Sequence, residues 1–323
     1  MDIQYLLFLQ NIRETYVPFL IHFMEMVSYF AISYILFIPA YIYWVKDKKA
    51  GHYILTAWSV ANALNATVKL TACVYRPWIR DPRVVPAGNA IATAGGYSFP
   101  SGHSTWASSL YGSTAYYCRR IGKKILMVVL ILLVFLTMFS RNFLGVHTPQ
   151  DVLVGMTEGF VMTLLIAKLY DKIEENHDLM DKCLLAGAIL SILAIIYILV
   201  KPYPMTYVDG KLLVDPVKMR YDGIQDISAL TAMMLWSYVD KRWIRFEPVE
   251  IKNFQKSILA AAGVGLYLVI SYLKSSCINT IGPNAGRVAY SFLLYFYMII
   301  LVPLVLKSSA EWKKSPFDQG NTV

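Results

Sequence analysis

Apolar runs of roughly 17 to 25 residues recur along the chain, separated by short charged clusters. A helix needs about 20 apolar residues to cross the bilayer core, and its backbone must satisfy its own hydrogen bonds there. The pattern therefore predicts an all-α, polytopic transmembrane bundle of about nine spans. The expected spans lie near residues 26–45, 53–73, 101–118, 125–139, 151–167, 183–200, 227–239, 257–272 and 288–306.

The two ends of the chain differ from these runs. Residues 3–12 are apolar but too short to cross, and Arg13 follows them, so we expect an N-terminal interfacial helix. The predicted divisions are an interfacial segment at 1–25, a catalytic helical core at 26–170, additional transmembrane helices at 171–306 and a cytoplasmic tail at 307–323.

Composition supports a membrane protein, because 57% of the 323 residues are hydrophobic and only 16% are charged. Basic loops at one membrane face account for the net charge of +9, so no nucleic-acid partner is expected. Eighteen of the 30 Lys and Arg fall on one set of connections, which should be cytoplasmic. The four cysteines lack the CxxC spacing of zinc or redox sites, and we expect no cofactor.

Lys69 and Arg76-Pro77 form the first polar motif. Lys69 falls in the outer turn of the second span, where snorkelling to the interface is the simpler interpretation. Arg76 follows closely enough for both cations to hold one anion, and a guanidinium binds two phosphate oxygens at once.

Pro100-Ser101-Gly102-His103 opens the third span. A helix start presents free N–H groups and a positive dipole end to an anion, and Gly102 permits close approach to the backbone. Ser101 as a plain N-cap is part of this picture. Capping does not explain His103.

The third polar motif, residues 140–151, lies between two apolar runs. Thr148, followed by proline, predicts a helix start, with His147 just outside it and Asp151 about one turn inside. A carboxylate there can accept a hydrogen bond from one imidazole nitrogen and leave the other free to attack. In the alternative interpretation, Asp151 only caps its own helix.

All three motifs fall on the face opposite the basic connections, which makes that face extracytoplasmic. Together the motifs supply three cations (Lys69, Arg76 and Arg141), a helix start, two histidines and one carboxylate. This set of groups suits phosphoryl transfer, which depends on positioning the substrate and neutralising the charge of the phosphoryl oxygens. The face has no carboxylate cluster to hold a metal, so we expect the cations to replace one.

The three motifs follow one another as KxxxxxxRP, PSGH and SRxxxxxHxxxD. In this order they resemble the signature of the type 2 phosphatidic acid phosphatase (PAP2) superfamily. All eleven defined positions are filled between Lys69 and Asp151. The resemblance implies that His147 is the nucleophile, that Asp151 orients it and that His103 is the general acid. It also implies a set of phosphate-binding residues, namely Lys69, Arg76, Ser101, Gly102 and Arg141, with Ser140 as an additional contact.

The resemblance implies an integral-membrane phosphatase, in a bacterial plasma membrane, that hydrolyses lipid phosphate monoesters or diphosphates through a phosphohistidine. With two spans before the first motif, the chain also resembles the glucose-6-phosphatase and sphingosine-phosphate phosphatase branches, so a soluble sugar phosphate is an alternative substrate. A non-catalytic phosphate or lipid binder, or a transporter, is a second alternative. The histidine pair argues against it, because binding alone needs only the cations.

Two features stay outside the predicted site. Glu158 lies two turns deeper than Asp151, and it either supports the site or pairs with a polar group such as Asn62 or Asn65. Segment 201–226 either covers the site or is a solvated connector.

Overall fold

The computed structural model describes residues 2–32, 37–248 and 253–313, and it confirms an all-α fold. Its helices are α1 (Asp2–Thr15), α2 (Leu20–Ile32), α3 (Phe37–Val45), α4 (Lys48–Ala72), α5 (Pro77–Arg80), α6 (Gly102–Arg120), α7 (Lys124–Phe143), α8 (Pro149–Glu175), α9 (His177–Val200), α10 (Pro216–Met219), α11 (Tyr221–Val239), α12 (Asn253–Ile281), α13 (Pro283–Phe296) and α14 (Val302–Lys313). Short 3₁₀ or π segments are η2 (Ala90–Thr93), η3 (Asp240–Ile244) and η4 (Tyr297–Leu301), and β1 (Tyr207–Val208) pairs with β2 (Lys211–Leu212) in a hairpin.

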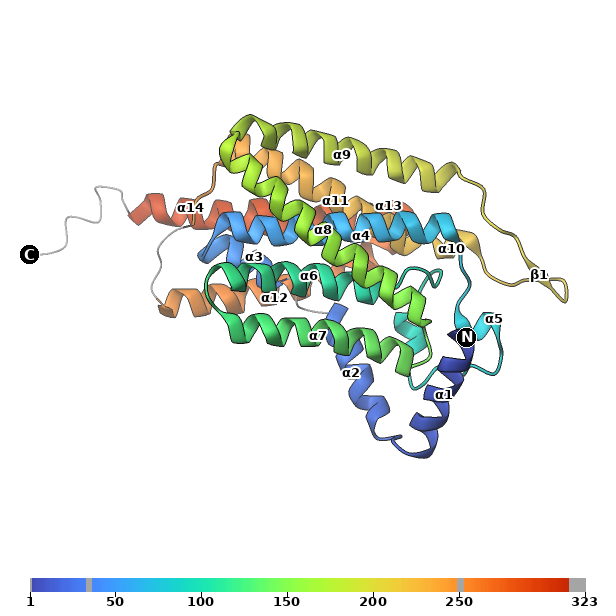
Figure 1. The fold of residues 1–323 in the computed structure, drawn as a ribbon. Coiled ribbons are helices and arrows are strands. Elements are labelled where there is room, and N and C mark those ends of the chain that lie inside the picture. The colour runs from blue at the N-terminus through green and yellow to red at the C-terminus, as the bar shows by residue number, and fades with distance from the viewer. Residues whose placement is uncertain (1, 33–36, 249–252, 314–323) are drawn as a thin grey trace, which may run out of the picture.

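The long helices lie side by side along one axis, the β-hairpin projects from one end of the bundle, and α1 and α2 form a V beside α7 (Figure 1). Helix α14 ends at the opposite end (Figure 1). Helix α4 packs against α6 and α8 on one side and against α9 and α11 on the other. It therefore joins the helices of the motif region to the C-terminal helices.

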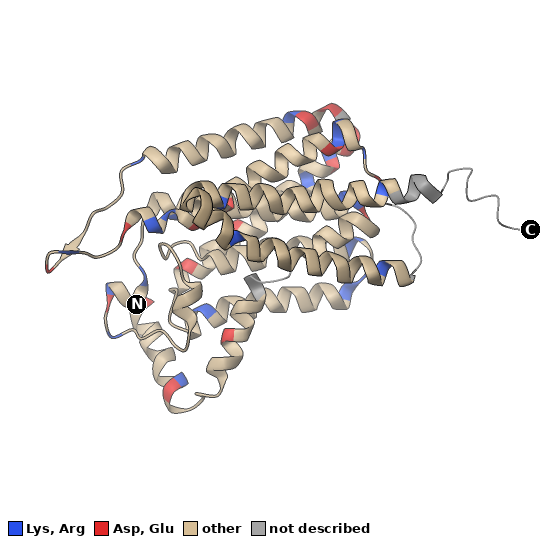
Figure 2. Ribbon diagram, turned by 180° about the vertical axis from the view of Figure 1, so that it is seen from behind, with Lys and Arg blue, Asp and Glu red and all other residues tan. Residues whose placement is uncertain are grey.

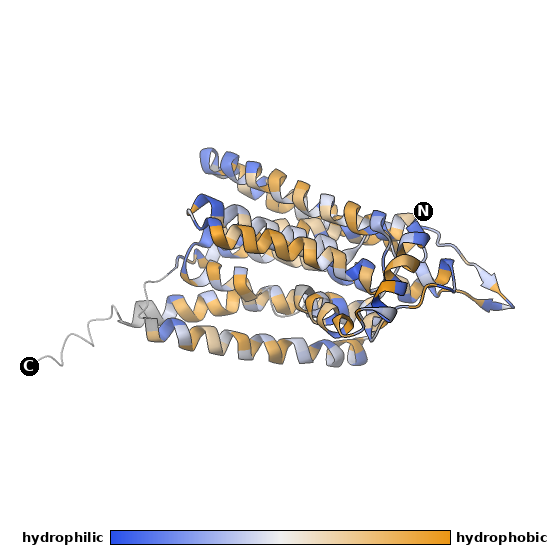
Figure 3. Cartoon of the chain, turned by 60° about the horizontal axis from the view of Figure 1, so that its bottom comes forward, coloured by the Kyte–Doolittle hydropathy of each residue, from blue (hydrophilic) through white to orange (hydrophobic). Residues whose placement is uncertain are grey.

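Five helical segments in the described part of the chain are long and apolar enough to cross a membrane. They are Lys124–Phe143, Pro149–Glu175, Asp178–Val200, Phe254–Ile281 and Pro283–Ser308, and apolar residues dominate the middle of the bundle in Figure 3. The predicted count of nine is not confirmed, because the span expected at 26–45 and the helices α4, α6 and α11 are not among them. These three helices carry polar residues toward their neighbours; in α6, Ser104, Thr105 and Ser108 are all buried.

Small residues allow α6 and α8 to pack closely. A Cβ atom on Gly155 would lie 2.5 Å from the Ser101 carbonyl oxygen and 3.0 Å from Thr105 Oγ1. The Ser101 amide donates to the Asp151 carbonyl at 2.8 Å, so the starts of the two helices are tied together. This contact places the second motif beside the third.

Several predicted boundaries are wrong. The single span expected at 26–45 corresponds to parts of two helices, α2 and α3, with residues 33–36 outside the described part of the chain. Helix α2 packs on α6 and α7, whereas α3 packs on α4 and α12, so different neighbours stabilise the two halves. Helix α11 begins at Tyr221, six residues before the expected 227, and α14 continues through 307–313, where the tail was expected to begin.

The N-terminal helix α1 is anchored to the motif region by Arg13. This side chain is 1% exposed and donates to the Phe143 carbonyl at 2.8 Å and to the Val85 carbonyl. A buried guanidinium needs such acceptors. The interfacial position of α1 stays a prediction, but its attachment to the end of α7 is clear.

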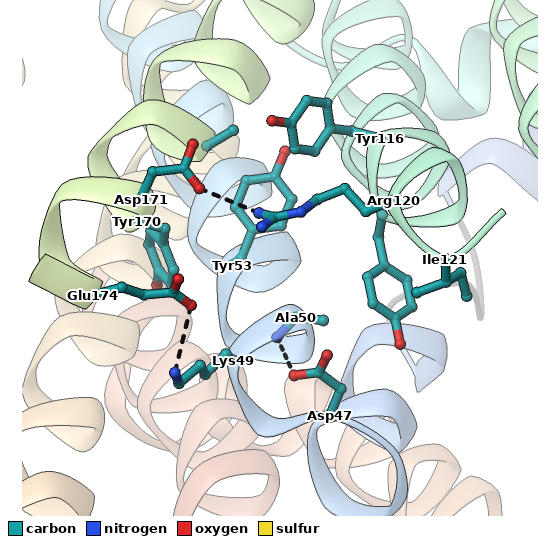
Figure 4. Close-up of a pocket in the computed structure, with 12 residues that line it drawn as sticks. Asp47, Lys49, Ala50, Tyr53, Tyr116, Arg120, Ile121, Tyr170, Asp171 and Glu174 are labelled. Carbon is teal, nitrogen blue, oxygen red and sulfur yellow. Dashed lines mark hydrogen bonds and ion pairs between the residues drawn. The ribbon is translucent and has the colours of Figure 1, made fainter.

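Charged residues gather mainly at the two ends of the bundle (Figure 2). At the end away from the motifs, Arg120 pairs with Asp171 at 3.2 Å and Lys49 pairs with Glu174 at 3.4 Å, around a cavity of about 290 Å³ (Figure 4). Both pairs are solvent-exposed, so each contributes little to stability. Figure 4 shows no histidine at this cavity.

Candidate active site

The three motifs meet at one end of the bundle. Lys69 comes from the last turn of α4, Arg76 from the following loop, Gly102 and His103 from the start of α6, and His147 from the α7–α8 loop. All five line one cavity of about 350 Å³. Residues separated by up to 78 positions are thus brought to one space, as the motif order predicted.

The imidazole of His147 lies between Arg76 and Asp151, and only the Arg76 contact has hydrogen-bond geometry. Arg76 Nη1 lies 2.9 Å from Nε2, and Asp151 Oδ2 lies 3.4 Å from Nδ1. A guanidinium can only donate, so Nε2 must carry a lone pair. The proton of the neutral ring is then on Nδ1, facing the carboxylate, and this is the tautomer that leaves Nε2 nucleophilic.

His147 is 1% exposed, and its pKa lies well below the ordinary imidazole value. Burial is the main cause, and the charge of Arg76 adds to it, while Asp151 opposes the shift. A lowered pKa keeps the ring neutral near pH 7, which a nitrogen nucleophile requires.

Asp151 both caps α8 and faces the histidine. Its Oδ2 accepts from the Thr148 amide at 2.9 Å and from Ser98 Oγ at 2.6 Å. Thr148 and Asp151 form a reciprocal capping box. The capping interpretation is therefore correct, and the same fixed carboxylate also lies beside His147.

Backbone carbonyls of the loop hold the two cations nearest the histidines. Arg76 donates to the carbonyls of Gly95 at 2.6 Å and Gly96 at 3.1 Å. Burial lowers the pKa of Arg76 to about 10, which still leaves it charged. Lys69 Nζ donates to the carbonyls of Pro100 and, at 3.2 Å, Tyr97. The loop thus fixes both positive charges at the cavity.

His103 faces the cavity with a free nitrogen. The side chain is 7% exposed, and its buried Nε2 has no partner among the described residues. A buried, unsatisfied imidazole nitrogen is costly unless a ligand completes it. Ser101 acts as the N-cap of α6, accepting from the Ser104 amide at 3.4 Å, and its side chain does not line the cavity.

Arg141 and Ser140 also lie outside the cavity lining. Arg141 is fully buried and donates to Ser28 and, at 3.4 Å, to Thr93, which does line the cavity. Its Nε and Nη2 have no partner within the described residues, and its charge contributes to the lowered pKa of His147. Ser140 Oγ donates to the Thr137 carbonyl at 2.6 Å, back into its own helix. In this arrangement Ser140 Oγ faces its own helix, and its phosphate contact stays a prediction.

Sequence reasoning missed several supporting residues. Ser98 holds Asp151, and Asn142 Nδ2 donates to the His147 carbonyl at 2.8 Å. The polar segment just before the third span was the available signal for Ser98. Glu158 pairs with Asn65 at 2.8 Å, one of the two partners considered, and also accepts from Thr105 at 3.3 Å.

The C-terminal helices complete the cavity. Asp222, Gln225 and Asp226 of α11 line it together with Lys274 of α12 and Ser291 of α13. The spacing of the α11 residues places them on one helical face, which the sequence shows once the helix is known to begin at Tyr221. No group of three His, Cys, Asp or Glu suited to a metal occurs in residues 2–32, 37–248 and 253–313.

Comparison with known proteins agrees with the motif geometry. The family model of the PAP2 superfamily matches residues 50–175, from α4 to the end of α8. Residues 50–175 of this chain are therefore called its PAP2 region. Phosphatidylglycerophosphatase B of Bacillus subtilis (strain 168) is 28% identical to it over 153 residues, which cover 46% of this chain and 71% of the relative. No solved structure matches the chain significantly. The PAP2 region contains every motif residue, while α9 to α14 lie beyond it.

Proposed function

We propose that this protein is an integral-membrane phosphatase that hydrolyses lipid phosphate monoesters or diphosphates through a phosphohistidine at the extracytoplasmic face. The match to the PAP2 family model and the similarity to phosphatidylglycerophosphatase B support a lipid phosphate phosphatase. The observation that carries the mechanism is the His147 ring, held between Arg76 and Asp151 and sharing one cavity with His103.

In the first step, Arg76 Nη1 moves its hydrogen bond from His147 Nε2 to a phosphoryl oxygen of the substrate, which frees the lone pair of Nε2. That lone pair attacks phosphorus, and the bond from phosphorus to the ester oxygen breaks. The departing oxygen takes the electron pair and a proton from His103, which enters this step as the imidazolium because the bound phosphate offsets the charge of the neighbouring cations. The Nδ1 proton of His147 faces Asp151, whose charge stabilises the developing imidazolium at 3.4 Å. The products of this step are phosphohistidine and the free alcohol.

In the second step, His103 accepts a proton from water while the water oxygen attacks the phosphohistidine. The phosphorus–nitrogen bond breaks, its electron pair returns to Nε2, and inorganic phosphate leaves. His103 is then protonated for the next cycle. One histidine thus serves as acid and then as base, as microscopic reversibility requires.

Charge neutralisation comes from the chain's own cations. Lys69 and Arg76 line the cavity, and Arg141 contacts Thr93, which also lines it. Together with the start of α6 they can stabilise the phosphoryl oxygens without a metal. Activity should persist in a chelator, and vanadate, which mimics the five-coordinate phosphorus, should inhibit. Complete loss in chelator, restored by Mg²⁺, would contradict this part of the proposal.

A lipid suits the position of the cavity better than a soluble ester. The catalytic groups lie at helix ends, and a lipid held in the bilayer presents its phosphate at that depth at high effective concentration. We expect kcat/KM for lipid phosphates to exceed that for glucose 6-phosphate in detergent and in liposomes. Equal or better turnover of the sugar phosphate would favour the alternative substrate while keeping the chemistry.

The deciding experiment traps the covalent intermediate. Wild-type protein quenched during turnover of a ³²P-labelled lipid phosphate should carry an acid-labile, alkali-stable phosphoryl group. His147→Ala should abolish both labelling and turnover. His103→Ala should slow turnover by about 10²–10⁴-fold, with the smallest loss for p-nitrophenyl phosphate, whose leaving group needs no proton.

His22→Ala is the matched control, because this histidine is 82% exposed and outside the site. It should behave like the wild type in both labelling and turnover. Near-normal turnover by His147→Ala would refute the phosphohistidine mechanism.

A further inference from the structure

The cavity that holds the two histidines continues between α4, α11, α12 and α13, beyond the PAP2 region. Its far wall is polar, with two carboxylates (Asp222 and Asp226), the Gln225 amide and the Lys274 ammonium. Placing polar groups on apolar helices costs free energy unless they bind a partner or a ligand. The proposed chemistry at His147 and His103 does not employ any of them.

Asp222 places this wall directly beside the phosphate end. A Cβ atom on Gly95 would lie 2.5 Å from Asp222 Oδ2, so the carboxylate packs directly against that glycine. The Gly95 carbonyl in turn accepts from Arg76 Nη2 at 2.6 Å. Asp226 follows one helical turn further along α11. The carboxylates are therefore next to the space where the leaving alcohol of a bound ester must lie.

The acceptors of this wall are not used by the protein itself. Within residues 2–32, 37–248 and 253–313, neither carboxylate forms a hydrogen bond or a close ion pair, although the charge of Lys274 attracts both, and the buried Oε1 of Gln225 has no partner. Lys274 lies over the Tyr290 ring at 5.7 Å. The buried, unpartnered Nε2 of His103 faces the same cavity. A ligand in this space would meet free acceptors on one side and the catalytic acid on the other.

We infer that Asp222, Gln225 and Asp226 form a leaving-group subsite that accepts hydrogen bonds from a donor, a hydroxyl or an ammonium, next to the phosphate ester. The inference rests on the proposed phosphatase function and adds its substrate class. Carboxylates bind donors strongly and repel a second anion at the same position. The subsite therefore favours a hydroxylated or amino alcohol over a plain alkyl alcohol.

Three lipids that differ at one atom test this inference. They are 1-O-hexadecylglycerol 3-phosphate, its 2-deoxy analogue and its 2-amino-2-deoxy analogue, each presented in the same detergent micelles. Wild-type kcat/KM should be about tenfold higher for the hydroxyl lipid than for the deoxy lipid, as expected for a hydrogen bond to a charged group. The kcat/KM of the amino lipid shows whether the subsite prefers an ammonium or a hydroxyl donor. A value above that of the deoxy lipid also supports the inference.

At a pH above 7, Asp222→Ala and Asp226→Ala should each reduce the hydroxyl-to-deoxy ratio by at least about threefold, since each removes an acceptor carboxylate. Burial and the neighbouring Asp222 raise the pKa of Asp226 to about 7, so Asp226 is fully ionised only above that pH. Turnover of the deoxy lipid should remain, which shows that the variants fold and that the phosphoryl chemistry is intact. Asp226→Asn provides a second variant of the same size should the alanine change unfold the protein. Asp209→Asn is the matched control, because it removes a carboxylate from the exposed hairpin turn, away from the cavity.

Equal turnover of the hydroxyl and deoxy lipids by the wild type, or an unchanged ratio in the aspartate variants, would overturn the subsite and leave the phosphatase function in place. Absence of turnover of all three lipids, together with the absence of phosphoenzyme, would refute the function itself and the inference with it.

Discussion

At the scale of single residues, donor and acceptor chemistry fixes the tautomer of His147. Arg76 cannot accept a hydrogen bond, so its contact with His147 Nε2 at 2.9 Å requires a lone pair on that nitrogen. Asp151 is itself fixed by Ser98 and the Thr148 amide. The tautomer therefore depends on groups that never touch the substrate, and it can be tested without measuring activity.

The first prediction concerns the protonation of His147. Because burial and Arg76 disfavour the imidazolium, the ring should stay neutral as the pH falls through the ordinary value of about 6.5 and should protonate only well below it. ¹⁵N NMR of substrate-free protein in detergent should show the Nδ1–H tautomer at pH 7. The spectrum of His147→Asn assigns the signal. Protonation above pH 6.5 would contradict the prediction.

The second prediction concerns Arg76. Arg76→Lys keeps the positive charge but loses the planar guanidinium, whose N–H groups donate to the Gly95 and Gly96 carbonyls and to the His147 ring. With each charged hydrogen bond contributing about 1.5–3 kcal/mol, kcat/KM should fall by about 10²-fold or more. Arg80→Lys is the control, since its contact is an exposed pair with Asp2, and it should change kcat/KM by less than about threefold. Comparable effects of the two variants would count against the assigned role of Arg76.

At the scale of elements, the site depends on how closely α6 and α8 approach. The Ser101 amide is bonded to the Asp151 carbonyl across the two helix starts, and glycine at 155 leaves room for that contact. Polar residues on α6 are satisfied inside the contact; Ser108 Oγ, for example, donates to the Ser104 carbonyl at 2.7 Å. The second and third motifs are therefore held as one unit.

The third prediction follows from this contact. In Gly155→Ala the added Cβ would meet the Ser101 carbonyl at 2.5 Å, so the starts of α6 and α8 must separate. Overpacking of this kind costs about 1–3 kcal/mol, and thermal unfolding in detergent should occur at a lower temperature. Turnover should fall as well, because His103 moves with α6.

Gly265→Ala in α12 is the control for this change, since a Cβ there meets nothing within 4 Å. Its unfolding temperature should be unchanged or slightly raised by the better helix propensity of alanine. Equal unfolding temperatures for Gly155→Ala and the wild type would show that the α6–α8 contact is not tight.

At the scale of the whole molecule, α4 joins two groups of helices around one cavity. The PAP2 region supplies the wall that carries the motif residues, and α11 to α13 supply the opposite wall. The motifs and the hairpin lie at one end of the bundle, and α14 ends at the other (Figure 1). The distribution of basic residues then predicts which end faces the cytoplasm.

The fourth prediction tests this orientation. In a cysteine-free background, Val208→Cys in the exposed hairpin should react with an impermeant thiol reagent in intact cells, because it lies at the motif end. Lys123→Cys, exposed in the turn before α7, should react only after the membrane is opened. The reverse labelling pattern would place the active site in the cytoplasm.

The sequence by itself determined the all-α class and the PAP2 signature, and it predicted the positions of His103, His147 and Asp151 at helix starts. These features are local: a helix start, a cap and a charged residue in an apolar run are each set by neighbours within a turn or two. The His147 pair with Asp151 spans only four positions, so spacing along one helix start was enough to predict it.

Only the tertiary structure decided which of the candidate residues face the cavity. Ser140 turns back into its own helix and Arg141 lies behind Thr93, although both belong to the motif. Asp222 and Asp226 reach the cavity from a helix about 70 residues further on, which no local pattern can place. Contacts between distant segments depend on how whole helices pack. For the same reason, hydropathy alone did not decide whether α4, α6 and α11 cross the membrane, because their polar faces are turned toward neighbouring helices.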